Sequence, residues 1–281
     1  MSWLAIVALL CFAANSILAR LALRAGEIDA ASFTAIRLAA GAITLWLLVR
    51  ARGAALRFGG RGNWTAALLL FLYAAPFSFA YLELPAGIGA LILFAAVQLT
   101  MIGAGVSRGE RPVWREWLGL ALALAGVAYL NLPGLSAPAP LGAALMAIAG
   151  IAWGLYSLRG RGSVAPLNET AAAFLLATPF GLALGAAGAT RSHLSGIGVA
   201  CAIASGAVAS GGGYAAWYRV LPRLSATRAG TIQLAVPVLA ALAGVLLLGE
   251  RLTSRLVLSA IAILGGVGLA ISSRASRVIS R

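Results

Sequence analysis

The chain of 281 residues contains no lysine, one histidine, two cysteines and seven acidic residues. Without a lysine, the glycines of 209–214 cannot form a phosphate-binding loop, which needs a lysine after them. His193 lies outside the apolar segments, so it cannot serve a buried serine nucleophile. Four of the acids lie at segment ends, and Glu27 and Asp29 lie in a loop, so we expect neither paired catalytic acids nor a metal-ligand cluster. These absences argue against an enzyme, and we expect no catalytic residue, metal or cofactor.

Apolar residues, in contrast, dominate the composition. They make up 62% of the chain, charged residues make up only 10%, and the mean hydropathy is +0.97. A water-soluble fold of this length cannot hide that much apolar surface. Cys11 and Cys201 both lie in apolar segments, so we expect small core residues there rather than a disulfide.

Apolar segments of about 20 residues recur, each long enough to cross roughly 30 Å of hydrocarbon. Short connections join them, and no soluble domain is left over. The sequence therefore predicts an all-α membrane protein with ten transmembrane helices in the lipid bilayer. We place these helices at residues 2–20, 30–50, 63–82, 86–107, 115–131, 139–158, 169–188, 195–219, 226–248 and 254–272.

All 21 basic residues are arginines, and the formal net charge is +14. In a soluble chain such a charge would suggest nucleic acid. If the N-terminus is cytoplasmic, fifteen arginines fall on the cytoplasmic side, five fall on the other side, and Arg37 lies within a span. This asymmetry follows the positive-inside rule. We therefore expect an inner-membrane protein with both termini in the cytoplasm and no nucleic-acid partner.

A repeat divides the chain into halves. Gly109-Glu110-Arg111 and Gly249-Glu250-Arg251 each close an apolar segment, 140 positions apart. We predict two five-helix repeats at residues 1–131 and 141–281, joined by a linker at 132–140. Because five is odd, the second repeat must cross the membrane in the opposite sense. Inverted repeats are typical of transporters that bind substrate near the midplane, between the halves.

Helix-breaking residues fall at matched positions of the third and eighth spans. Pro76 removes a backbone hydrogen bond in one, and Gly211-Gly212-Gly213 weakens the equivalent turn in the other. Pro237 lies within the ninth span. Proline and glycine are common in membrane helices generally. Their matched positions beside aromatic residues nevertheless favour hinges next to a binding cavity.

Few polar side chains lie inside the spans. Asn15, Ser16, Gln98 and Gln233 must find partners away from lipid. They either join helices to one another or face a cavity and bind an ammonium or carboxylate group. Arg37 is unfavourable at its depth, and it either anchors to backbone carbonyls or holds a substrate carboxylate.

Aromatic residues gather in the third, sixth and eighth spans. Tyr73, Phe77 and Tyr81 are four residues apart and so share one helix face. Such rings suit apolar or aromatic substrates and can attract an ammonium group. Near span ends tryptophan usually forms an interfacial belt, which we assign to Trp3, Trp46, Trp64, Trp114 and Trp117. We predict a substrate site between spans 1, 3, 4, 6, 8 and 9, formed by Asn15, Tyr73, Phe77, Tyr81, Gln98, Trp153, Tyr156, Tyr214, Trp217 and Gln233.

The chain resembles a ten-span member of the drug/metabolite transporter superfamily, of the EamA-like type. The motifs that carry the resemblance are Phe12-Ala13-Ala14-Asn15-Ser16, Ala35-Ile36-Arg37, Ala152-Trp153-Gly154 and both Gly-Glu-Arg endings. Within the superfamily it looks closest to the YddG-type exporters of aromatic and other neutral amino acids. One feature departs from the family: members usually carry proline in span four as well as span nine, but Val97-Gln98 stands opposite Pro237 here. The fourth span is therefore expected to be the straighter of the two.

We expect a monomeric secondary transporter that exports small neutral amino acids, preferably aromatic, or related metabolites by alternating access. Glu83 is the one acid close to a span interior and His193 lies in a loop, so we expect no obligatory proton exchange. A proton-coupled exporter of other metabolites or drugs is an alternative. A channel and a structural membrane subunit are further alternatives. The chain lacks a filter-like ring of acids, and a structural subunit would need no polar or aromatic interior.

Overall fold

The computed structural model describes residues 3–56, 58, 61–107, 114–132, 137–160, 163–188, 193–220 and 232–279. Over these residues the chain is all α-helical, apart from one isolated antiparallel bridge between Ile28 and Leu194. Ten helices result when the continuous stretch Gly196–Val220 is taken as one. The elements are α1 (Trp3–Arg24), α2 (Ala30–Ala51), α3 (Arg61–Ala80), α4 (Ala86–Ser107), α5 (Trp114–Asn131), α6 (Pro140–Gly160), α7 (Pro166–Ala187), α8 (Gly196–Ala204), η2 (Ser205–Gly212), α9 (Gly213–Val220), α11 (Ala235–Leu248) and α12 (Ser254–Ile279).

Seven of these helices are long and apolar enough to cross a membrane, judged by length and composition. They are α1, α2, the Asn63–Ala80 part of α3, α4, α6, α7 and the continuous α8–η2–α9 stretch. α11 has 14 residues and the apolar part of α12 covers Ser254–Leu269, so both are shorter, and α5 is not one of the seven. The expected ninth span begins at residue 226, which lies outside the described residues. Of the ten expected spans, seven thus meet this criterion of length and composition in the described part of the chain.

Polar side chains and a glycine set several helix ends. Asp29 accepts a hydrogen bond from the Ser32 amide at 2.8 Å and caps α2. Ser195 caps α8 in the same way, accepting from the Gly198 amide at 3.0 Å. α11 ends at Gly249, whose φ of 64° lies in the left-handed region that favours glycine.

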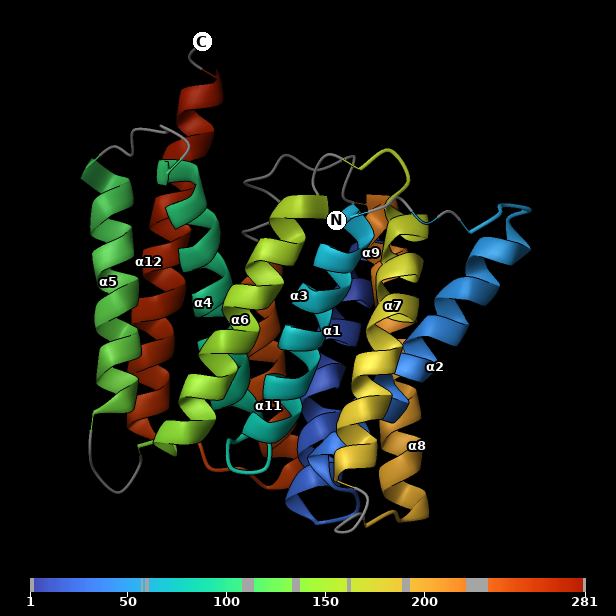
Figure 1. Cartoon of the computed structure of the whole chain (residues 1–281). Helices are drawn as coiled ribbons and strands as arrows, with labels where there is room; N and C mark the ends of the chain where they lie inside the picture. The colour runs from blue at the N-terminus through green and yellow to red at the C-terminus, as the bar shows by residue number, and fades with distance from the viewer. Residues whose placement is uncertain are drawn as a thin grey trace.

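The helices of the two chain halves interleave. α2 packs on α7, α4 on α11 and α5 on α12. α6 packs on α3 and α4, while α1 packs on α9, η2 and α11. Under the repeat, α1 corresponds to α6, and α3 corresponds to α8–η2–α9. When each helix in a pairing is replaced by its counterpart from the other half, the result is again a pairing that the structure contains. In Figure 1 the α5–α12 pair lies at one edge of the bundle, and α2 leans outward at the opposite edge.

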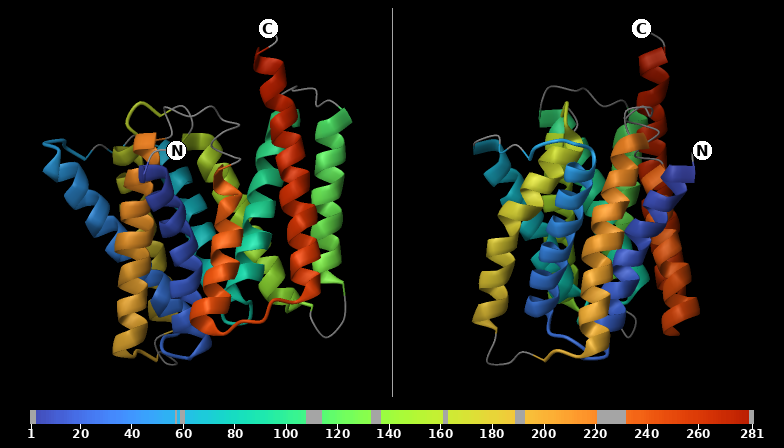
Figure 2. Two further views of the ribbon diagram at one scale, coloured as in Figure 1. Left: turned by 180° about the vertical axis from the view of Figure 1, so that it is seen from behind. Right: turned by 90° about the vertical axis from the view of Figure 1, so that its right-hand side faces the viewer.

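The two ends of the chain lie at the same end of the bundle, which we call the terminal end (Figures 1 and 2). The turns α1–α2, α3–α4 and α11–α12 lie at the opposite end. The five tryptophans expected in an interfacial belt are all exposed. Arg37 is the largest fully buried side chain. The bundle therefore has an apolar outer surface and an interior that includes a charge.

Candidate functional site

An aromatic cluster lies between α3, α6 and α9. Trp153 of α6 stacks on Tyr214 of α9, with ring centroids 5.1 Å apart and planes at 21°. The same ring stacks on Tyr156 at 5.4 Å and 23°. It also lies 5.0 Å from the ring of Tyr73 on α3. One indole thus joins three helices from both halves of the chain.

The cluster extends in two directions from this centre. Along α3, Phe77 lies 5.4 Å from Tyr73 and 4.7 Å from Tyr81, as the four-residue spacing predicts. On the α9 side, Phe12 of α1 lies 5.9 Å from both Tyr214 and Trp217. All seven aromatic residues of the predicted site therefore belong to one continuous cluster. The site predicted from the sequence includes neither Phe12 nor Phe174. The ring centroid of Phe174 nevertheless lies 5.8 Å from that of Tyr214.

Arg37 of α2 lies against the α3 rings of this cluster. Its guanidinium carbon is 5.0 Å from the Tyr73 ring centroid and 4.6 Å from that of Phe77. Nη2 donates a hydrogen bond to the Tyr73 hydroxyl at 2.8 Å. The side chain is 1% exposed, and Nη1 has no hydrogen-bond partner among the described residues. The guanidinium thus lies beside the rings, and none of its hydrogen bonds to described residues goes to a backbone carbonyl.

Asn15 of α1 is used to join helices. Its Oδ1 accepts a hydrogen bond from the Ser205 hydroxyl at 2.6 Å. Its Nδ2 donates to the Ser210 hydroxyl at 3.3 Å. Both serines belong to η2, so the amide holds α1 against the segment where the eighth span changes its winding.

The two glutamines of the predicted site lie on α4 and just before α11. Gln98 of α4 is buried, and its Nε2 has no hydrogen-bond partner among the described residues. Gln233 is half-buried just before α11. Within the described part of the chain, no hydrogen bond links either amide to the aromatic cluster. The structure thus joins the aromatic residues of the predicted site in one cluster, and the assignment of the two glutamines to that site stays a prediction.

The eighth span changes its winding in the middle. Ser205–Gly212 form a π-helix, an uncommon conformation that is frequent at functional sites. The predicted hinge glycines Gly211 and Gly212 lie in this segment, and Gly213 begins α9. A Cβ added to Gly206 would collide with the Arg37 carbonyl oxygen, so η2 and α2 touch through their backbones.

The two predicted hinge prolines lie within helices. Pro76 is inside α3, one residue before Phe77. Pro237 is the third residue of α11. Neither proline interrupts its helix, so any hinge at these positions acts by bending a continuous helix.

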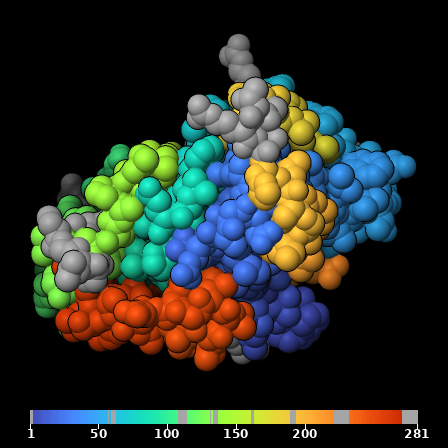
Figure 3. Space-filling view, turned by 90° about the horizontal axis from the view of Figure 1, so that it is seen from below, coloured from blue at the N-terminus to red at the C-terminus, as the bar shows by residue number. Residues whose placement is uncertain are grey.

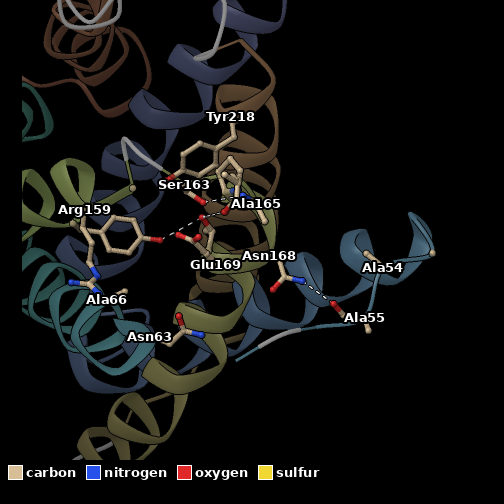
Figure 4. Close-up of a pocket in the computed structure, with 16 residues that line it drawn as sticks. Ala54, Ala55, Asn63, Ala66, Arg159, Ser163, Ala165, Asn168, Glu169 and Tyr218 are labelled. Carbon is tan, nitrogen blue, oxygen red and sulfur yellow. Dashed lines mark hydrogen bonds between the residues drawn. The ribbon is translucent and has the colours of Figure 1, made fainter. Parts of the chain in front are cut away.

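A pocket of about 720 Å³ lies at the terminal end of the bundle, between the ends of α2, α3, α6, α7 and α9. In Figure 4 Ser163, Glu169 and Tyr218 lie near one another, and Asn168 donates a hydrogen bond to the Ala55 carbonyl at 2.9 Å. Of the predicted site residues, Tyr156 alone belongs to its lining, which includes Asn63, Tyr156, Arg159, Ser163, Asn168, Glu169, Thr170 and Tyr218. Because Tyr156 stacks on Trp153, the pocket reaches the first ring of the cluster.

At the other end of the bundle, opposite the pocket, an ion pair joins the two halves of the chain. Arg20 Nε lies 3.5 Å from Glu250 Oε1, and both side chains are nearly buried. Nη1 of Arg20 donates to the carbonyls of Tyr81 and Leu82, each at 3.0 Å. Both carboxylate oxygens of Glu250 lie 2.9 Å from the Ala86 amide at the start of α4. We call this set of contacts the latch.

The latch ties α1 and the α3–α4 turn to the α11–α12 turn, and Figure 3 views the bundle from this end. The sequence does not predict the contact between Arg20 and Glu250. The predicted topology places Arg20 and Glu250 on the same side of the membrane, but it does not show which helices are neighbours. The repeat counterpart of Glu250 is Glu110 and that of Arg20 is Arg161, and both lie outside the described residues.

The buried groups can bind and orient a solute. Rings offer contact area, and Arg37 offers a hydrogen-bond donor and a positive charge. In the part of the chain that the structure describes, no three histidine, cysteine, aspartate or glutamate side chains come together.

This architecture defines a multi-pass helical membrane protein with an aromatic and charged interior. A solved crystal structure of a protein matches its fold with a TM-score of 0.68, covering 96% of this chain and 98% of that chain at 21% sequence identity. The model of the EamA-like transporter family matches twice, over residues 1–132 and 140–272. The chain belongs to the EamA-like transporter family, whose members are transporters rather than enzymes.

Two relatives extend the comparison. An uncharacterized protein of Pseudomonas aeruginosa is 50% identical over 274 residues, which are 98% of this chain and 95% of that protein. An uncharacterized transporter of Archaeoglobus fulgidus is 26% identical over 196 residues, which are 67% of this chain and 68% of that protein.

Proposed function

We propose that this transporter exports small neutral amino acids, preferably aromatic ones, or closely related metabolites. The observation that carries the proposal is the ring cluster centred on Trp153, with Tyr156 and Tyr214 stacked on its two sides. Flat ring faces bind an apolar or aromatic side chain and attract an ammonium group. A neutral amino acid combines these two features in one small molecule.

The proposed architecture is two inverted five-helix repeats, residues 1–131 and 141–281, joined by the linker 132–140. Its support is the pairing of helices across the halves, which keeps its pattern when the halves are exchanged. Both chain ends lie at one end of the bundle, as an even number of crossings requires (Figure 2). The excess of arginine that the sequence predicts on the side of the two termini favours a cytoplasmic position for them in an inner membrane. We propose that the monomer is the working unit.

The proposed mechanism is alternating access, with the site opened to one side at a time. The latch joins the halves at one end, whereas the pocket lies at the other. This asymmetry supports a state that faces the cytoplasm, from which an exporter loads its substrate. Opening the far side then requires the Arg20–Glu250 contact to separate.

The proposed energetics is facilitated export down the substrate gradient, without obligatory proton exchange. Glu83 is exposed in the α3–α4 turn rather than set in the interior, which speaks against a relay there. Glu250 is the nearly buried acid of the latch, and its carboxylate is occupied by Arg20 and the Ala86 amide. A proton-coupled mechanism would require Glu83, another acid such as Glu250, Glu116 or Glu169, or the substrate's own charge.

The test is uptake by liposomes that contain the purified chain, with a panel of radiolabelled neutral, acidic and basic amino acids. We expect saturable uptake of phenylalanine, tryptophan and leucine, and little uptake of glutamate or lysine. Flux that grows linearly with concentration would indicate a channel. Absence of uptake for every neutral amino acid would refute the substrate assignment.

A further inference from the structure

The charge of Arg37 is deeply buried. The residue lies seven positions into α2, which is roughly 10 Å from the start of the helix. Its side chain is 1% exposed. Arginine at such a depth in a membrane helix is strongly unfavourable unless it is paired, and it commonly marks a substrate pathway.

No acid among the described residues forms an ion pair with Arg37. The other buried arginine, Arg20, is paired with Glu250 in the latch. The buried acid Glu116 belongs to α5, a helix that packs on α12 and α4. Nη1 of Arg37 therefore lies buried without a hydrogen-bond partner in the described structure. A buried guanidinium edge of this kind can donate a charge-assisted hydrogen bond to an anion.

Two aromatic rings stabilise the buried charge of Arg37. The rings of Tyr73 and Phe77 lie within 5.0 Å and 4.6 Å of its guanidinium carbon. Cation–π contact of this kind partly replaces hydration. The same two rings continue to Trp153 and then to Tyr156 at the pocket, so an anion held by Arg37 lies beside the rings that accept the side chain.

We infer that Arg37 is the carboxylate-binding residue of the transport site. This inference rests on the proposed function and adds a requirement to it, namely that the substrate carries one negatively charged group. Arg37 is the one buried arginine of the described chain without an ion-pair partner, so a singly charged carboxylate is matched better than a phosphate dianion. When a carboxylate binds, the guanidinium loses part of its contact with the rings. In return, Nη1 donates a charge-assisted hydrogen bond to the carboxylate.

The experiment measures ligand-dependent thermal stabilisation of the purified protein in detergent. Three probes are used: phenylalanine, phenylalaninamide, which lacks the carboxylate charge, and 3-phenylpropionate, which lacks the ammonium group. The wild type is compared with Arg37→Gln, Arg37→Lys and Arg50→Gln. Arg50 is exposed on the same helix and serves as the matched control.

We expect phenylalanine and phenylpropionate to stabilise the wild type and Arg50→Gln, and phenylalaninamide to have little effect. Arg37→Gln should weaken carboxylate binding by about 10- to 100-fold, as expected for a charge-assisted hydrogen bond. Arg37→Lys should still prefer the carboxylate over the amide, but with lower affinity, because an ammonium group cannot reproduce the guanidinium edge. If Arg37→Gln does not fold, Arg37→Lys decides the question by this loss of affinity.

The outcomes separate this inference from the proposed function. Stabilisation by phenylpropionate but by no amino acid supports the Arg37 site and refutes amino-acid export. Equal stabilisation by phenylalanine and its amide, or unchanged carboxylate affinity in the folded Arg37 variants, overturns the Arg37 site and leaves amino-acid export standing. A wild type that responds to neither carboxylate also overturns it.

Discussion

Trp153 contacts the rings of Tyr73, Tyr156 and Tyr214, so a single side chain joins α3, α6 and α9. The sequence could predict this group because its members recur at matched positions of the repeat. It could not predict that Phe12 and Phe174 belong to the same cluster, since a ring in an apolar segment does not show which way it faces. The glutamines were predicted from polarity alone, and polarity does not distinguish a cavity from a helix contact.

At the residue scale we predict that Trp217→Ala reduces transport while membrane insertion stays normal. The substitution removes a buried ring that contacts Phe12, a loss of ~1–3 kcal/mol, which corresponds to about a 10- to 100-fold lower kcat/KM. Gln98→Ala is expected to act in the same direction. Proteoliposome uptake measures the effect, with Trp46→Ala on the exposed surface as the control. Normal transport by both interior variants would show that the predicted site is wrong.

At the element scale, helix positions follow closely from the apolar segments, because in hydrocarbon the backbone must satisfy its own hydrogen bonds. α4 covers residues 86–107, as predicted. The π-helix over Ser205–Gly212 was not predicted, because small residues allow a wide turn but do not require it. The predicted hinge at Gly211 and Gly212 falls within it. The contact of Gly206 with Arg37 depends on which helices are neighbours, and local sequence does not contain that information.

A glycine substitution tests the close approach of η2 and α2. Gly206→Ala should destabilise the protein by ~1–3 kcal/mol, because the added Cβ would collide with the Arg37 carbonyl oxygen. Gly103→Ala is the control, since a Cβ there meets nothing within 4 Å. Thermal unfolding in detergent compares the two variants. Equal stability of both would contradict the close packing of these elements.

The latch leads to a second prediction at this scale. Glu250→Gln removes the charge that Arg20 faces, so the latch end should open more often. A cysteine in place of the buried Ser16, one turn from Arg20, should then react faster with a membrane-impermeant thiol reagent applied from the latch side. Cys11 and Cys201 are first replaced by serine. Leu21→Ala, at an exposed position on the same helix, should leave the rate unchanged. An unaltered rate in Glu250→Gln would rule out a gating role.

At the scale of the whole molecule, the sequence predicted the division into halves because the Gly-Glu-Arg endings recur 140 positions apart. It could not predict that Glu250 meets Arg20, which lies 230 positions away in the other half. The two ends of the bundle also differ, and the sequence repeat does not predict this difference. The latch end is joined by an ion pair, and the terminal end holds the pocket. This difference between the ends of the described structure supports the proposed alternating access, in which one side is closed while the other is open.

The inverted topology predicts on which side of the membrane two exposed loop positions lie. Ala54 follows α2 at the terminal end, and His193 precedes α8 at the latch end. Cysteines placed at these positions, one at a time in a chain without Cys11 and Cys201, should be labelled from opposite sides of the membrane. The Ala54 position should react only after the cytoplasmic side is exposed. Labelling of both positions from the same side would exclude the proposed topology.

Counterflow of phenylalanine in proteoliposomes, with and without an imposed pH gradient, tests the central claim most directly. The vesicles are loaded with unlabelled phenylalanine, and entry of the labelled amino acid is followed. A facilitated amino-acid carrier should show transient labelled accumulation that saturates and is the same with or without the pH gradient. Accumulation against the phenylalanine gradient that is driven by the pH difference, and is lost in Glu83→Gln or Glu250→Gln, would contradict uncoupled export. A complete absence of counterflow would contradict amino-acid transport itself.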